Sequence, residues 1–74
     1  MNHEYEKKIG GRIRELREKS KLTQEQLSAR LQVSGYDITR SALAKIEVGQ
    51  RHLYPDEIKL IKEILAVEFD DIFI

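Results

Sequence analysis

The side chains with the most useful chemistry in this chain lie in the segment TRSALAK. If that segment is helical, Arg40, Ser41 and Lys45 project from the side opposite Leu43 and Ile46. A guanidinium can donate two hydrogen bonds to O6 and N7 of a guanine, and a hydroxyl group or an ammonium can bind a base edge or a phosphate. This grouping favours a polar binding surface over an ordinary solvated helix face.

Two further side chains suit the same chemistry. Ala42 carries a methyl group that can pack on the methyl group of a thymine. Gln24 lies at a predicted helix start, where its side chain and the nearby amides can reach a phosphate that the helix dipole also favours. The alternatives are plain exposure for Ala42 and a simple polar residue at a helix start for Gln24.

Catalytic and metal-binding patterns are weak in this sequence. The two histidines are far apart, there is no cysteine, and no glycine-rich phosphate loop follows a strand. Asp56 and Glu57 are adjacent carboxylates, but they lack the ligand spacing of a calcium loop. We therefore expect no enzymatic activity, metal ion, cofactor or small-molecule ligand.

Two capped helices must position the candidate residues. Thr23 precedes an apolar helical pattern and has Gln26 three residues later, which is the pattern of a capping box. Thr39 precedes a second such pattern, and Gly49 stands where a left-handed helix end needs glycine. Two short helices around a tight connection form a helix-turn-helix, whose second helix can enter the major groove of DNA.

The rest of the chain completes a small helical bundle. Tyr5, Ile9, Ile13 and Leu16 are spaced to share one face of a first helix, and the paired glycines at 10–11 either allow close packing or fray that helix. The pattern predicts an all-α single domain over residues 1–74, with five helices at about 4–19, 24–32, 40–48, 55–65 and 69–73.

The charge distribution is uneven although the net charge is zero. Residues 1–51 carry eleven Lys and Arg against seven Asp and Glu, which gives +4, and residues 52–74 carry two against six, which gives −4. The basic half coincides with the helix-turn-helix, as expected of an electrostatic footprint for nucleic acid. No apolar stretch is long enough to span a membrane and MNHEYEKK lacks the apolar core of a signal peptide, so we expect no membrane association and a cytoplasmic protein.

The runs LTQEQLSARL and ITRSALAKIEVGQR resemble the phage repressor and Cro-type helix-turn-helix family, also called the xenobiotic-response-element family. IGGRIRELREKSKLTQ resembles its first helix, and YPDEIKLIKEILAVEFDDIF its last two. The resemblance implies a five-helix, lambda-repressor-like DNA-binding domain. One departure is a connection from Gln32 to Ile38 that is about five residues longer than usual, which leaves the docking angle open.

The resemblance also implies roles for single residues. The family pairs an arginine of the first helix with a glutamate of the third, here Arg17 and Glu47, in a structural ion pair. It uses a glutamine at the start of the second helix, here Gln24, on a phosphate, and the loop after the third helix commonly touches phosphates, here through Arg51. Its last helix is a common dimer contact, and the apolar residues there are Phe69, Ile72, Phe73 and Ile74. The alternative for Phe69 and Ile72 is that they close the core of the monomer and leave Phe73 and Ile74 for the dimer contact.

The expected function follows from these implications. We expect sequence-specific binding of double-stranded DNA by a small stand-alone transcriptional regulator, acting as a repressor and as a homodimer on a pseudo-palindromic operator. The alternative is a helical protein-interaction module that has lost DNA binding. The zero net charge and the lengthened turn favour that alternative.

Overall fold

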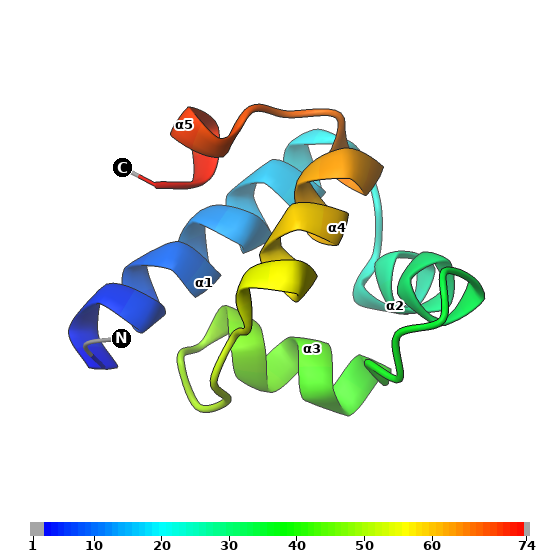
Figure 1. Ribbon diagram of the computed structural model, residues 1–74, viewed down its shortest axis with the longest axis horizontal. Helices are drawn as coiled ribbons and strands as arrows, with labels where there is room; N and C mark the ends of the chain where they lie inside the picture. Colours follow the sequence, from blue (N-terminus) through cyan, green and yellow to red (C-terminus); the bar gives the residue numbers. More distant parts are fainter. Residues whose placement is uncertain (1–2, 74) are drawn as a thin grey trace.

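The computed structural model describes residues 3–73, which form five α-helices and no strand. The helices are α1 (His3–Lys19), α2 (Gln24–Val33), α3 (Arg40–Glu47), α4 (Pro55–Leu65) and α5 (Phe69–Ile72). Figure 1 shows α5 at the top and α3 at the bottom of the view, α2 at the right, and α1 and α4 running diagonally between them. The predicted all-α, five-helix architecture is confirmed, and no described helix is long and apolar enough to cross a membrane.

One apolar core joins all five helices. Its fully buried members come from each helix and from the loops: Ile9, Ile13, Leu27, Leu31, Ile38, Leu43, Ile46, Ile61 and Ile72. Tyr5 is a correction, because the helical spacing predicted that it shares the buried face, yet it is 37% exposed. It lies in the first turn of α1, at the edge of the core.

The two adjacent glycines of α1 have different environments. A Cβ atom on Gly10 would lie 2.1 Å from the backbone oxygen of Ile46, whereas a Cβ atom on Gly11 would meet nothing within 4 Å. Gly10 therefore allows α1 to cross α3 in backbone contact. Helix α1 is continuous through both residues, so the fraying alternative is excluded.

Local signals set the helix ends. The capping box at the start of α2 is present, with Thr23 Oγ1 accepting from the N–H of Gln26 and the Gln26 side chain accepting from the N–H of Thr23. Thr39 Oγ1 accepts from the N–H of Ala42 at the start of α3. After α3 the chain turns at Gly49, whose φ is +78°. The caps predicted from the sequence thus place α2 and α3.

Candidate nucleic-acid interface

The outer face of α3 carries the side chains that the sequence singled out. Arg40, Ser41 and Lys45 are exposed, while Leu43 on the opposite side is fully buried. Ala42 is only half-buried and packs against the core, so part of its methyl group is turned away from solvent. Helix α3 therefore presents two cations and a hydroxyl group along one surface.

A buried ion pair holds the C-terminal end of α3. Arg17 donates from Nε to Glu47 Oε2 at 2.7 Å and from Nη2 to Glu47 Oε1 at 3.0 Å, and its Nη1 donates to the carbonyl of Leu22 at 2.8 Å. Hydrogen bonding to Glu47 raises the pKa of Arg17, so the guanidinium stays charged although it is buried. The structure thus brings together the two residues that the resemblance pairs.

Gln24 joins the same polar cluster. Its Nε2 donates to Glu47 Oε1 at 3.0 Å, so the side chain braces α3 from the start of α2. An amide nitrogen carries two hydrogens, and the second can still be donated outward. Gln24 therefore retains one donor for a phosphate.

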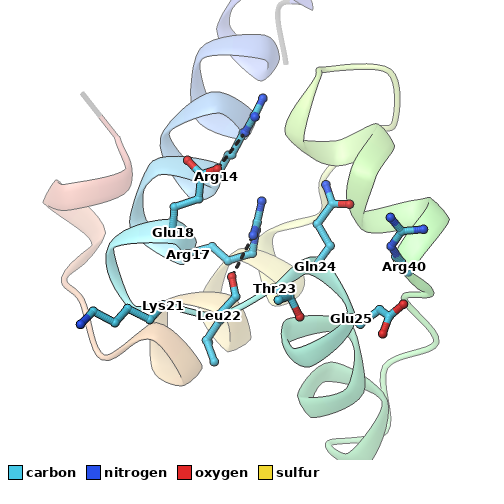
Figure 2. Close-up of a pocket in the computed structure, with 9 residues that line it drawn as sticks. All are labelled: Arg14, Arg17, Glu18, Lys21, Leu22, Thr23, Gln24, Glu25 and Arg40. Carbon is cyan, nitrogen blue, oxygen red and sulfur yellow. Dashed lines mark hydrogen bonds and ion pairs between the residues drawn. The ribbon is translucent and has the colours of Figure 1, made fainter.

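These residues line an open hollow between α1, α2 and α3. Figure 2 shows Arg14 and Arg17 on α1, Gln24 at the start of α2 and Arg40 on α3 around it, and its volume is about 760 Å³. Lys21 also lines the hollow and has a φ of +60°, an uncommon conformation for a residue other than glycine. The hollow is polar and opens beside the first residue of α3.

Carboxylates neutralise several cations of this surface. Arg14 pairs with Glu18 at 3.5 Å, and Arg17 is committed to Glu47. No ion pair within residues 3–73 involves Lys21, Arg40 or Lys45. The cations that remain available to an anion are therefore fewer than the sequence count suggests.

Arg51, expected to touch a phosphate, has a partner inside the protein. Its Nη1 and Nη2 donate to the two carboxylate oxygens of Glu57 at 2.9 and 3.1 Å, and Nη1 also donates to the carbonyl of His52. Burial by itself would raise the pKa of Glu57, but hydrogen bonds from Arg51 and from the backbone N–H of Tyr54 outweigh it and lower that pKa. A phosphate contact by Arg51 would compete with this pair.

The α2–α3 connection is long but ordered by hydrogen bonds. Helix α2 ends at Val33, Gly35 follows with a φ of +93°, and the N–H of Tyr36 bonds back to the carbonyl of Leu31 at 3.0 Å. The Tyr36 ring packs against the core. Two effects raise the pKa of its phenol: partial burial, which is the larger, and the negative charge of the Asp56 carboxylate. The connection is therefore held to α2 by a backbone hydrogen bond and to the core by the Tyr36 ring.

The apolar residues of α5 divide between core and surface. Phe69 and Phe73 are 42% and 39% exposed, with ring centroids 6.2 Å apart. Ile72 was expected in a dimer contact, and this is a correction: the residue is 0% exposed and closes the core of its own chain. Ile74 lies outside the described residues. The two phenylalanines border an apolar hollow of about 490 Å³ that also includes Pro55 and Ile58.

The structure adds two contacts that the sequence analysis missed. Arg12 is half-buried and donates through Nε to the carbonyl of Asp71, which ties α5 to α1. Ser28 is 4% exposed and donates to the carbonyl of Ile38 at 2.8 Å. Both acceptors are backbone carbonyls, which every residue has, so the sequence does not identify them. The one sequence signal for the second contact is the hydroxyl group of Ser28 on the buried face of α2.

The chain matches known helix-turn-helix proteins in sequence and in shape. The helix-turn-helix family model matches residues 13–72. The structure is similar to the crystal structure of the DNA-binding domain of BldD, with a TM-score of 0.83, 18% sequence identity and 100% of each chain covered. No curated protein matches the chain. At that identity the likeness to BldD shows a common fold.

Proposed function

The chain belongs to the phage repressor and Cro-type helix-turn-helix family of DNA-binding regulators, and from that premise we propose that it binds double-stranded DNA sequence-specifically as a transcriptional repressor. In this proposal α3 is the recognition helix and enters the major groove. Occlusion of a promoter requires no surface beyond the one that binds DNA. A cytoplasmic place of action stays a prediction.

The exposed face of α3 is the observation that carries the proposal. Arg40 is its first residue, is exposed and has no ion pair with any of residues 3–73, so its guanidinium is available to a guanine. Ser41 is beside it, and Lys45 lies about one turn further along the exposed face, where an ammonium group can bind a flanking phosphate. We assign base contacts to Arg40 and Ser41, a backbone contact to Lys45, and a smaller apolar contact to the half-buried Ala42.

The start of α2 supplies the second part of the proposed contact. Gln24 points from α2 toward the hollow in Figure 2, with Arg40 on the neighbouring helix. We assign Gln24 to a phosphate through its second amide hydrogen, and we retain Arg51 as a weaker phosphate contact because Glu57 holds it. Both contacts would orient the protein on the duplex without adding sequence preference.

We further propose that the protein binds DNA as a homodimer through Phe69 and Phe73. Both rings are exposed beside an apolar hollow, so a second copy can cover the pair. Helix α5 lies at the opposite end from α3 in Figure 1, which leaves both recognition helices free. Half-sites of such dimers lie about 34 Å apart, and the domain measures 29 × 21 × 20 Å, so two adjacent copies match that scale.

A protein-interaction module without DNA binding is the second candidate. The pairing of Arg14, Arg17 and Arg51 with carboxylates favours it, because it leaves few cations for phosphates. The two candidates differ in their dependence on salt. A DNA reader loses affinity steeply as salt rises, since each phosphate contact releases counterions.

The test is a titration against DNA selected from random duplexes, repeated at about 50 mM and about 200 mM salt. We expect the wild-type protein to bind with a strong salt dependence. Arg40→Ala should reduce the preference for the selected sequence over a scrambled one by about tenfold or more, as the loss of a bidentate base contact predicts.

Lys8→Ala is the matched control for charge. Lys8 is exposed on α1 beside Arg12, which bonds to α5, so this substitution removes one cation that does not belong to the exposed face of α3. Lys8→Ala should leave the sequence preference unchanged. If the wild-type protein fails to bind at about 50 mM salt, or if Arg40→Ala behaves like Lys8→Ala, the proposed function is wrong.

A further inference from the structure

The carbonyl of Ile38 is held by two side chains of α2. Ser28 Oγ donates to it at 2.8 Å, and Gln32 Nε2 donates both to this carbonyl at 3.3 Å and to Ser28 Oγ at 3.2 Å. Ser28 is 4% exposed and Ile38 is 1% exposed, so water has little access to the hydroxyl–carbonyl bond. We name Ser28, Gln32 and the Ile38 carbonyl the α2 latch.

The position of this carbonyl in the chain gives the latch its importance. Ile38 directly precedes Thr39, the N-cap of α3, and Arg40 is the first residue of that helix. The connection from Ser34 to Thr39 is long, and several of its residues are exposed, so chain length alone does not fix where α3 begins. A bond from α2 to the Ile38 carbonyl does fix it.

Two polar anchors therefore hold α3, one at each end. Arg17 and Gln24 bind Glu47, the last residue of the helix, and the latch binds the carbonyl that precedes its N-cap. Leu43 and Ile46 pack α3 into the core, and the two polar anchors add a fixed point at each end of the helix. Without the latch, the N-terminal end would lose its polar anchor while Glu47 keeps its own, so Arg40 would move the most.

We propose that Ser28 and Gln32 are positioning residues that set the angle of the recognition helix and thereby the sequence preference of this protein. The proposal rests on the proposed function. The physical cause is that a buried carbonyl without a donor is costly. When the latch is removed, the Ile38 carbonyl gains hydrogen bonds by turning toward water, and Thr39 and Arg40 move with it.

The test uses the double variant Ser28→Ala/Gln32→Met, which removes both donors at similar side-chain size. We expect its preference for the selected sequence over a scrambled duplex to fall by about tenfold, as misplacement of a bidentate base contact predicts. Its affinity for the scrambled duplex and its salt dependence should stay unchanged, because phosphate contacts determine both. Ser28→Thr keeps the hydroxyl group and should restore the preference in the Gln32→Met background.

Two measurements separate positioning from loss of stability. Ile72→Val weakens the core in α5, far from the latch, and should lower the stability without changing the sequence preference. Hydrogen exchange needs no DNA: the N–H of Leu43, bonded to the carbonyl of Thr39, should exchange about tenfold faster in the double variant, while that of Ile58 at the start of α4 should not change.

The outcomes distinguish this inference from the proposed function. If the wild-type protein prefers no DNA sequence, the proposed function fails, and exchange at Leu43 still decides whether the latch holds α3. If the folded double variant keeps the wild-type preference within twofold, or Ile72→Val loses it equally, the latch does not set specificity. Unchanged exchange at Leu43 would refute the latch itself.

Discussion

The adjacent glycines of α1 provide a sharp test of the structure, because they should respond in opposite directions to the same substitution. A Cβ atom on Gly10 would lie 2.1 Å from the backbone oxygen of Ile46 and 3.2 Å from the carbonyl carbon of Glu47. Ordinary van der Waals contact begins near 3.4 Å, so α1 and α3 would have to separate by about 1 Å. A Cβ atom on Gly11 would meet nothing within 4 Å.

The magnitudes follow from two opposing terms. Alanine is favoured over glycine inside a helix by about 1 kcal/mol, and Gly11→Ala should gain that amount. Gly10→Ala gains the same term but incurs an overpacking cost of about 1–3 kcal/mol, and the upper end applies because the obstacle is backbone. The difference between the variants is then about 3 kcal/mol, or roughly 12–24 °C in Tm at 4–8 °C per kcal/mol for a domain of this size.

Urea and thermal unfolding of the two variants would measure this difference. Gly10→Ala should also weaken binding to the selected DNA, since Ile46 belongs to the recognition helix. Gly11→Ala serves as the control, because it changes the same chain segment by the same atoms. Equal effects of the two substitutions, in either direction, would refute the close crossing of α1 and α3.

Three other predictions concern the ion pairs and the apolar surface. Arg17→Met should lower the free energy of unfolding by about 3–5 kcal/mol in urea denaturation because it leaves Glu47 buried and unpaired, and the double variant Arg17→Met/Glu47→Leu should lose less; an equal loss would contradict the pairing. The pKa of Glu57 is lowered by folding, so its ionised form stabilises the protein above the ordinary value of 4.5 and that stabilisation disappears as the pH falls through the lower folded pKa. Glu57→Gln should therefore be less stable at pH 7, and its Tm should fall less than that of the wild-type protein as the pH is lowered. The same dependence of Tm on pH in both proteins would contradict a lowered pKa of Glu57. Phe73→Ser should abolish dimers in sedimentation velocity while Val33→Ser, an exposed apolar position on α2, leaves them intact; a wild-type protein that is monomeric at every concentration would contradict the dimer.

The sequence predicted the elements that depend on local chemistry. Thr23 and Thr39 marked the starts of α2 and α3 because an N-cap needs a side-chain oxygen at one fixed position. It could not separate Gly10 from Gly11, since only the crossing with α3 distinguishes them. It also missed the bond from Ser28 to the Ile38 carbonyl, because an acceptor on the backbone is the same for every residue.

The same limit applies to charge. Residues 1–51, which contain the helix-turn-helix, carry a net charge of +4 by count. A count does not show which of these cations face carboxylates. The pair between Arg51 and Glu57 spans six residues across a loop, outside the helical spacing that makes ion pairs predictable. Arg51 was therefore placed on DNA by resemblance, and the structure shows its competing partner.

Stability and recognition depend on the same contacts in this protein. Helix α3 has eight residues, and a helix that short is not stable in water by itself, so packing and the polar anchors at its two ends must maintain it. In the proposed function, the contacts that orient Arg40 toward DNA are also the contacts that keep α3 folded. A variant that loses sequence preference is therefore informative only beside a variant of equal stability, which is why Ile72→Val belongs in the same experiment as the α2 latch.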